Sequence, residues 1–270
     1  MARPVEMSEY IAIDAYDTFE ERHAYFPEMM GEMLRRFAAD RPTTPKGTPL
    51  PCRVLELGAG TGIFTRRLAK QPLVVCTAVE IDANCFAALE RTLLRYPGAR
   101  AVAADSRTYR SAEGRGEFPY IFSSFADHHI RPEDKTAYLD GVAYHLAPDG
   151  RFIVGDEFLP DHDADDPDAW RDAVRRYHGH IIDVSLRRAE ELTAAGDEPG
   201  AHAHRELVKL ETAAMESGLA RQGDFKVTRT AYERTLTEHG FAFTSVTIGP
   251  TDRDDVGGIH VYEIHRETSL

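Results

Sequence analysis

The chain has 270 residues, of which 42% are hydrophobic and 29% are charged, and its formal net charge is −13. This composition is typical of a globular protein, and a surface with this charge repels nucleic-acid backbones. The odd number of cysteines argues against a disulfide framework and for a reducing compartment. No apolar stretch approaches the roughly 20 residues of a membrane span, and the N-terminus lacks the apolar core of a signal peptide. These features predict a cytoplasmic protein that acts on small molecules, with no nucleic-acid or membrane partner.

The first half of the chain predicts helices followed by a β/α alternation. Residues 8–40 read as mostly helical, with Pro27 in the first turn of a helix, and the Pro/Gly-rich segment 41–51 reads as a loop. Apolar strands that alternate with helices indicate a parallel sheet with both faces covered. The predicted strands are Arg53–Leu57, Leu73–Val79, Ala99–Ala104, Phe118–Ser123 and Phe152–Gly155, and the predicted helices are Gly62–Lys70, Ala83–Tyr96 and Pro132–Leu146.

The alternation stops after Glu157 and resumes near residue 224. The polar segment 161–223 is predicted to be helical, with interruptions at 196–200 and 218–223. A helix over Thr228–Glu238 and two strands, Phe241–Ile248 and Ile259–Ile264, complete the chain. The last two strands are joined by about ten residues without a helix, so they should pair antiparallel. The predicted fold is an α/β three-layer sandwich with a seven-stranded, mostly parallel sheet, an antiparallel last strand and a helical insertion.

The strongest motif is VLELGAGTG, at residues 54–62. A strand runs into three glycines at alternate positions, Gly58, Gly60 and Gly62, and a helix follows. Glycine lets the backbone turn sharply and lets a ligand lie against the main chain, while the N–H groups at a helix start favour an anion or a carboxylate. The alternative is a tight strand–helix turn that binds no ligand.

Two acidic residues end the next two predicted strands. Glu80 ends the second strand and could accept hydrogen bonds from both hydroxyls of a ribose. Asp105 ends the third and could accept one from an adenine amino group. Each could instead be an exposed loop acid, but both strand ends meet at one edge of the sheet.

A dinucleotide site would show similar glycines and the same ribose acid. Three features argue against it: Glu56 lies where a pyrophosphate would be repelled, the loop is Gly-x-Gly-x-Gly, and the sheet ends in a hairpin.

The sequence resembles the class I, Rossmann-like S-adenosylmethionine-dependent methyltransferases, in their small-molecule branch. The resemblance covers about residues 50–157 and 226–265. It is carried by LELGAGTG, the acid of AVEID, AADS, the strand end IFSSFADHHI, and HLAPDGRFIVGDEF. It implies S-adenosylmethionine as cofactor and S-adenosylhomocysteine as product. The residues implied to contact the methionine part, the ribose, the adenine and the sulfonium are Glu56, Gly58, Ala59, Gly60, Gly62, Glu80, Ile81, Asp105, Ser106, Ser123 and Ser124.

The methyl acceptor should face the end of the fourth strand. His128 or His129 could be a general base, because imidazole titrates near neutral pH, or either could be structural. Phe125 and Asp127 are predicted to contact the substrate, although Asp127 could instead cap a helix. Asp156 and Glu157, after the fifth strand, could bind a cationic amine or take a proton, or could simply be a polar strand end.

Three segments complete the predicted organisation. Residues 51–157 and 224–270 form the methyltransferase core, residues 1–50 cover the cofactor, and residues 158–223 form a substrate lid. Tyr16 and Tyr25 of the first segment are candidate cofactor contacts, and Tyr177 and His178 of the lid are candidate substrate contacts. A packing role in the core is the simpler interpretation of these four side chains. The His-x-His pairs are on predicted helices, where i and i+2 point apart, so no metal site is expected.

The leading hypothesis is an enzyme that moves a methyl group from S-adenosylmethionine to a small amine, amino-acid derivative or electron-rich aromatic such as an indole. N- or C-methylation is favoured over O-methylation, and the Arg- and Ala-rich composition suggests bacterial specialised metabolism. A non-catalytic nucleotide-binding regulatory module and an oxidoreductase that uses NAD or FAD are the alternatives. The sequence leaves a homodimer open.

Overall fold

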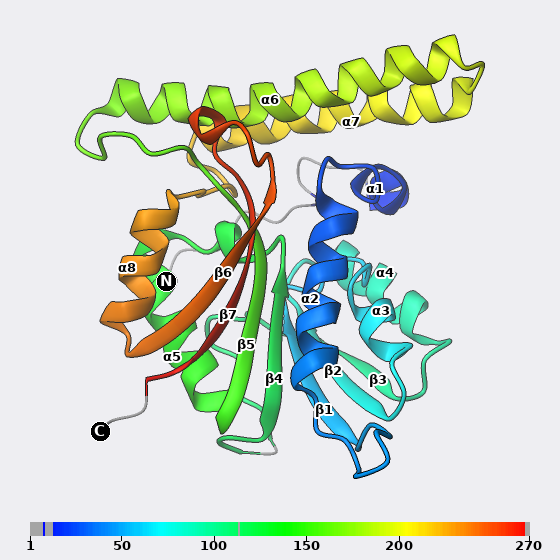
Figure 1. The fold of residues 1–270 in the computed structure, drawn as a ribbon, viewed down its shortest axis with the longest axis vertical. Helices are drawn as coiled ribbons and strands as arrows, with labels where there is room; N and C mark the ends of the chain where they lie inside the picture. Colours follow the sequence, from blue (N-terminus) through cyan, green and yellow to red (C-terminus); the bar gives the residue numbers. More distant parts are fainter. Residues whose placement is uncertain (1–7, 9–12, 113, 268–270) are drawn as a thin grey trace.

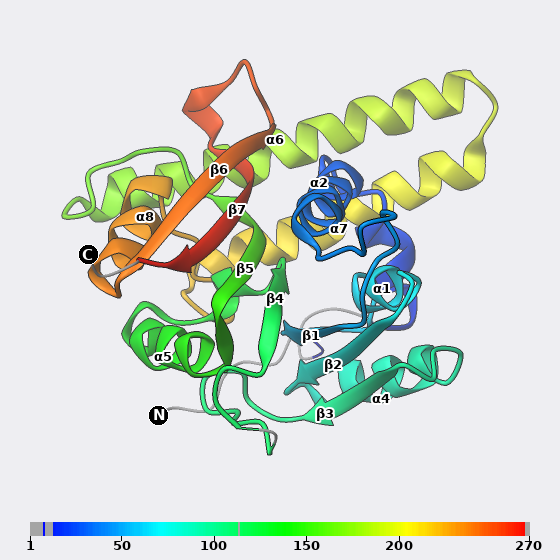
Figure 2. The same ribbon diagram turned by 60° about the horizontal axis from the view of Figure 1, so that its bottom comes forward.

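The structure is a computed structural model that describes residue 8, residues 13–112 and residues 114–267. Its centre is one seven-stranded sheet with the strand order β3-β2-β1-β4-β5-β7-β6, and the strands lie side by side in this order in Figure 2. Their bounds are Cys52–Leu57 (β1), Val74–Glu80 (β2), Ala99–Ala103 (β3), Phe118–Ser124 (β4), Leu146–Phe158 (β5), Phe241–Gly249 (β6) and Gly258–Arg266 (β7).

Only β7 runs against its neighbours. It pairs antiparallel with both β5 and β6, while β1 to β5 pair parallel with one another. The predicted seven-stranded sheet with a reversed last strand is therefore confirmed. The parallel strands bring their carboxyl ends to the same edge of the sheet, where Glu80 ends β2 and Glu157 lies near the end of β5.

Helices cover both faces of the sheet (Figure 1). They are α1 (Ile13–Glu20), α2 (Phe26–Asp40), α3 (Thr65–Ala69), α4 (Ala83–Leu93), α5 (Lys135–His145), α6 (Pro167–Ala194), α7 (Glu198–Leu219) and α8 (Arg229–Glu238). Side chains alternate between the faces along a strand, so Val54 packs with α2 and α3 while Leu55 packs with α5 and α8. The methionines of α2 are fully buried against the first face.

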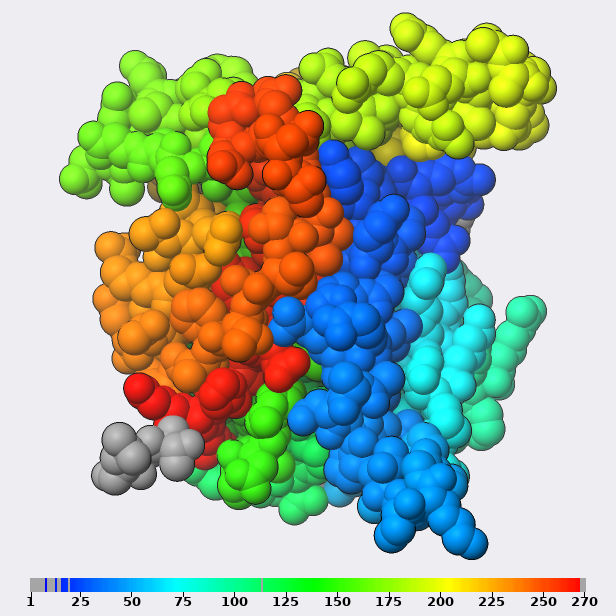
Figure 3. Space-filling view, viewed as in Figure 1, coloured from blue at the N-terminus to red at the C-terminus, as the bar shows by residue number. Residues whose placement is uncertain are grey.

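Helices α6 and α7 form a long antiparallel hairpin across one end of the molecule (Figure 1). Tyr177 of α6 donates a hydrogen bond to Glu157 near the end of β5, so the hairpin lies over the carboxyl ends of the strands. Asp166 and Asp197 cap the two helices with their side chains. The predicted helical character of 161–223 and its break near residue 196 are confirmed. In Figure 3 the hairpin meets the N-terminal helices and the β6–β7 turn.

Two predicted boundaries are wrong for identifiable reasons. Strand β5 begins at Leu146, and its register with β4 jumps from Leu146 to Arg151 between Phe118 and Tyr120. Residues 147–150 therefore bulge out of the ladder within the strand. Helix α3 begins at Thr65, because the residues after the glycines still form turns.

Candidate active site

The glycine loop is held in a conformation that favours glycine. Gly58, Gly60 and Gly62 have φ angles of 73°, 55° and 93°, which residues with a Cβ rarely adopt. A Cβ on Gly58 would lie 2.5 Å from the Cβ of Ala126, and one on Gly62 would lie 2.9 Å from Leu89. Nothing lies within 4 Å of a Cβ at Gly60. The loop therefore packs closely at two positions and is open at the third.

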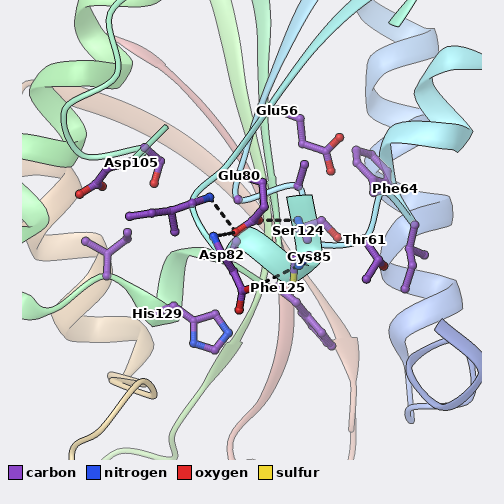
Figure 4. A pocket seen from close by; sticks show the side chains of 18 of the residues that line it. Glu56, Thr61, Phe64, Glu80, Asp82, Cys85, Asp105, Ser124, Phe125 and His129 are labelled. Carbon is purple, nitrogen blue, oxygen red and sulfur yellow. Dashed lines mark hydrogen bonds between the residues drawn. The ribbon is translucent and has the colours of Figure 1, made fainter. Parts of the chain in front are cut away.

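A pocket lies between this loop, the ends of β2 to β4 and the N-terminal helices (Figure 4). We call it the glycine-loop pocket. It encloses about 1060 Å³ of empty space, part of which is open to solvent. It is lined by Tyr16, Phe26, Glu56, Gly58, Ala59, Gly60, Thr61, Ile63, Phe64, Glu80, Ile81, Asp82, Cys85, Asp105, Ser106, Arg107, Ser124, Phe125, Ala126, His129, Ile130, Arg131 and Phe225.

Glu80 is fixed at the centre of this pocket by the backbone. Its Oε2 accepts a hydrogen bond from the N–H of Gly60 at 2.7 Å, and its Oε1 accepts from the N–H groups of Ile81 and Asp82 at 2.8 and 2.7 Å (Figure 4). Burial raises the pKa of Glu80, although these three donors oppose that shift. A carboxylate accepts about four hydrogen bonds, so one position on Oε2 is left for a ligand hydroxyl in this conformation.

Glu56 is a buried carboxyl group on the strand that enters the loop. Its Oε2 accepts a hydrogen bond from the Thr65 hydroxyl at 2.6 Å. Burial raises the pKa of Glu56 to about 8; Glu80 adds to the shift and Thr65 opposes it. A buried carboxyl group with one partner is a favourable place for a cationic ligand group, which would restore its charged form.

Asp105 lines the pocket but is already paired. Arg107 donates to its carboxylate from the backbone N–H and from the guanidinium, at distances of 2.5 to 3.0 Å. Arg107 also bonds Asp134, which ties the loop after β3 to the start of α5. The predicted adenine contact by Asp105 would therefore share its oxygens with Arg107, a residue that the sequence reasoning missed.

The other predicted cofactor residues divide into two groups. Ala59, Ile81, Ser106, Ser124 and Tyr16 line the glycine-loop pocket. Ser123, Gly62 and Tyr25 do not line it.

Ser123 is fully buried inside the sheet, and Gly62 faces Leu89 and Thr92 of α4. Tyr25 also lies outside the pocket lining. Its hydroxyl is 3.2 Å from Nε2 of His180, and its ring stacks on that histidine and packs against Gly249. Its φ of 68° at the start of α2 turns the side chain toward the helical hairpin.

A second, smaller pocket adjoins the first under α7. We call it the charged pocket. It shares Tyr16, Phe125 and His129 with the glycine-loop pocket. Its lining is Tyr16, Glu20, His23, Phe125, His128, His129, Glu157, Leu207, Leu210, Glu211, Ala214, Asp224 and Lys226. These residues come from four separate parts of the chain.

The two adjacent histidines have different environments. His128 donates from its backbone N–H to Asp156 at 2.9 Å, and its Nδ1 lies 2.5 Å from the other oxygen of that carboxylate. Burial opposes the charged ring, but Asp156 and Glu157 raise the pKa of His128. Burial, with the neighbouring His128, lowers the pKa of His129 to about 4. The Nδ1–H of His129 donates to the carbonyl of Gly223, so its Nε2 is an acceptor.

Glu157 lies at the centre of the buried ion pairs. Its Oε1 accepts from the Tyr177 hydroxyl at 2.5 Å, and its Oε2 is 3.1 Å from Nζ of Lys226. Burial opposes ionisation, but Lys226, His128 and His23 lower the pKa of Glu157. Lys226 also pairs with Asp224. This pairing raises the pKa of Lys226, although burial of the lysine opposes the shift.

Four residues predicted to be catalytic or to contact the substrate line neither pocket. Asp156 is buried behind His128 and lines neither pocket. Asp127 is buried and pairs with Lys135 beside Tyr232. Tyr177 is buried on Glu157, and Nδ1 of His178 lies 2.6 Å from Glu211 of α7. These four side chains hold the site together, because each is bound to a buried partner.

The sequence reasoning missed Glu20, His23, Glu211, Asp224 and Lys226 of the charged pocket. Each lies in a polar helix or loop, and no spacing links them.

Among the described residues there is no group of three or more His, Cys, Asp and Glu side chains that could hold a metal ion. Within the same part of the chain, no helix has the length and apolarity to cross a membrane.

Comparison with known proteins agrees with this geometry. Residues 54–150 match a family model described as a methyltransferase domain. An uncharacterized methyltransferase of Staphylococcus carnosus (strain TM300) is 29% identical over 111 residues, which cover 38% of this chain and 46% of that protein. This part of the chain is therefore similar to a methyltransferase domain. Its match spans less than half the length of this curated relative.

Solved structures resemble most of the chain in fold. The YcgJ protein of Bacillus subtilis has a TM-score of 0.56 at 15% identity, with 89% of this chain and 99% of that chain covered. The DhpI-SAM-HEP complex has a TM-score of 0.54 at 16% identity, with 94% of each chain covered. Phosphoethanolamine N-methyltransferase 2 of Haemonchus contortus, solved with phosphomonomethylethanolamine and S-adenosylhomocysteine, has a TM-score of 0.57 at 14% identity, covering 95% and 57%. At these identities the likeness establishes the Rossmann-like fold alone.

Proposed function

We propose that the protein transfers a methyl group from S-adenosylmethionine to a nitrogen or carbon atom of a small molecule. One observation carries the proposal: the glycine-loop pocket adjoins a smaller charged pocket, and Tyr16, Phe125 and His129 line both. A methyl donor in the first pocket and an acceptor in the second would be held side by side. Such positioning is the main requirement of a direct displacement.

The residues of the glycine-loop pocket fit this donor. The buried carboxyl of Glu56 suits the ammonium of the methionine part, the free position on Glu80 suits a ribose hydroxyl, and Ser106 borders a place for the adenine. S-adenosylmethionine would supply the activated methyl group. The protein would supply orientation and the exclusion of water.

The roles of the histidines follow from their partners. His128, bound to Asp156, would support the charged pocket as a fixed cation. His129 would contact the acceptor through its neutral Nε2, because a pKa of about 4 makes it a weak base near neutral pH. Residues 1–50 and the α6–α7 hairpin would cover the two pockets and exclude water.

Several finer features belong to the same proposal. The net charge of −13 supports a small-molecule acceptor and argues against nucleic acid. A cytoplasmic location, a role in bacterial specialised metabolism and a homodimer stay predictions from the sequence.

The direct test is methyl transfer. The protein is incubated with isotopically methyl-labelled S-adenosylmethionine and panels of small amines, indoles and phenols, and products are separated by mass spectrometry. We expect labelled product with amines or indoles and little with phenols. Binding of the donor without transfer to any member of the panels would favour the non-catalytic alternative.

A further inference from the structure

Helix α1 places two side chains over the two pockets. Tyr16 and Glu20 are four residues apart, which puts them on the same helix face. Tyr16 lines both pockets, and Glu20 lines only the charged pocket. Asp17 points elsewhere, to Thr61 and Arg66, and fastens the helix over the glycine loop. Glu20 is therefore held beside the place where donor and acceptor would meet.

The charged pocket contains more carboxyl groups than cations. Its four carboxyl groups are Glu20, Glu157, Glu211 and Asp224, and its cations are Lys226, His23 and His128. His128 is already paired with Asp156 behind the pocket.

Three of these carboxyl groups have close cationic partners. Glu157 and Asp224 pair with Lys226. Nδ1 of His178 lies 2.6 Å from Glu211, and Nε2 of His23 is 3.5 Å from both Glu157 and Glu211. Despite burial, such partners lower the pKa of Glu211 and Asp224 as well as that of Glu157.

Glu20 is the remaining carboxyl group. It is 8% exposed, and its side chain makes no hydrogen bond or ion pair with another residue in the described part of the chain. Burial, with Glu157 and Glu211, raises the pKa of Glu20 to about 7, while His23 and His128 oppose the shift. A buried, unpaired carboxyl group is costly unless a cation joins it. The pocket therefore has a place for a fourth positive charge.

The remaining walls of the charged pocket are apolar. Phe125 closes the side toward the glycine-loop pocket, and Leu207, Leu210 and Ala214 of α7 form the roof. A ligand for this space combines a cationic group with a short hydrocarbon part. An uncharged aromatic such as indole would leave Glu20 without a partner.

We propose that the methyl acceptor is a small aliphatic amine, whose ammonium group pairs with Glu20, and that Glu20 removes the proton that frees the nitrogen lone pair. This inference rests on the proposed function and names the acceptor class for the same site. The acceptor ammonium gives one proton to the carboxylate of Glu20, which leaves a neutral amine and a neutral carboxylic acid.

The nitrogen lone pair then forms a bond to the methyl carbon. The bond from that carbon to sulfur breaks, and its electron pair stays on sulfur as S-adenosylhomocysteine. The product is the methylated ammonium, and Glu20 returns its proton to water. The cations Lys226 and His23 favour the first step, because like charges nearby lower the pKa of an ammonium.

The test compares three probes of similar size: propylamine, 1-propanol and propionate. Each is titrated by calorimetry into protein saturated with S-adenosylhomocysteine. We expect propylamine to bind about tenfold or more tightly than 1-propanol, the gain of a charge-assisted hydrogen bond, and propionate not to bind. Equal binding of amine and alcohol would overturn the proposal.

Glu20→Gln removes the carboxylate charge from the charged pocket. Glu28→Gln removes the same charge at an exposed position of α2 and is the control. We expect E20Q to lose the preference for propylamine over 1-propanol, E28Q to keep it, and both to bind S-adenosylhomocysteine like the wild type. An E20Q variant that keeps the preference would contradict the assignment. Failure to bind S-adenosylhomocysteine would instead remove the proposed function.

A second measurement tests proton removal apart from binding. With an amine that the protein methylates, the rate at saturating substrate should fall about 100-fold in E20Q, the usual scale of general-base catalysis, and recover in part in Glu20→Asp. The wild-type rate should rise with pH and level off as Glu20 becomes charged. An unchanged rate and pH profile in E20Q would show that another group removes the proton.

Discussion

The two pockets of this protein are built in opposite ways. The glycine-loop pocket is formed mostly by residues 56–131, and its polar contacts come from backbone N–H groups that converge on Glu80. The charged pocket is assembled from residues 16–23, 125–129, 157 and 207–226, and it depends on side-chain ion pairs. Changes in the first should affect ligand binding, while changes in the second should affect stability as well.

Removal of the central cation should have the largest effect. Lys226→Met leaves Asp224 and Glu157 buried without their main partner, which should lower the free energy of unfolding by about 3–5 kcal/mol. Lys209→Met, on the exposed face of α7, should change it by about 0.5 kcal/mol or less. Denaturant unfolding followed by circular dichroism measures both. A loss of similar size in both variants would contradict the claim that the buried ion pairs of Lys226 stabilise the charged pocket.

The charged pocket should also make stability depend on pH. Despite burial, Glu211 and Glu157 raise the pKa of His23 from 6.5 to about 9. A raised histidine pKa stabilises the fold fully below pH 6.5, and this contribution is lost as the pH rises through 9.

His23→Gln should therefore remove up to about 3 kcal/mol of the fall in unfolding free energy between pH 6.5 and 9. His202→Gln, at an exposed position of α7, should leave the dependence as it is. Chemical unfolding at a series of pH values tests this, and equal slopes in H23Q and the wild type would refute it.

A change in the glycine loop should lower ligand affinity, with a smaller loss of stability than Lys226→Met. Gly58→Ala adds a Cβ at a φ of 73°, directly against Ala126. The loop must shift, and we expect the affinity for S-adenosylhomocysteine to fall about tenfold or more with a stability loss of about 1–3 kcal/mol.

Gly179→Ala is the control, because a Cβ there meets nothing within 4 Å inside α6. It should stabilise the protein by about 0.5–1 kcal/mol without changing affinity. Thermal unfolding and calorimetry measure the pair, and unchanged affinity in G58A would show that the loop does not contact the ligand.

The affinity for the donor should also depend on pH. Because the pKa of Glu56 is raised to about 8, a cationic ligand must displace its proton at lower pH. The affinity for S-adenosylhomocysteine should therefore rise by up to about tenfold per pH unit below 8. Glu56→Gln should bind more weakly and lose this dependence. An equal slope in the variant would assign the dependence to another group.

The contrast between the pockets also explains what the sequence could predict. The glycine loop, Glu56, Glu80 and Asp105 were recognisable because each lies in or directly after a short apolar strand, which the local sequence pattern predicts. The antiparallel pairing of β6 and β7 followed from their short connection. Each of these features depends on neighbours in the sequence.

The charged pocket could not be predicted because burial decides its chemistry. Glu20, Glu211 and Lys226 look like ordinary surface residues of polar segments, and only the packing of α7 over the sheet brings them together. For the same reason His178 and Tyr177 were expected to face the substrate, although their partners are Glu211 and Glu157. The hydrophobic pattern of α6 indicates a buried face without saying what polar groups that face meets.

The central claim is that the glycine-loop pocket holds S-adenosylmethionine with Glu80 on its ribose. Calorimetric titration of S-adenosylhomocysteine into the wild type, Glu80→Gln and the exposed control Glu90→Gln tests it most directly. We expect one site per chain in the wild type and E90Q, and an affinity about tenfold or more lower in E80Q. Absence of binding by the wild type, or equal binding by E80Q, would contradict the account.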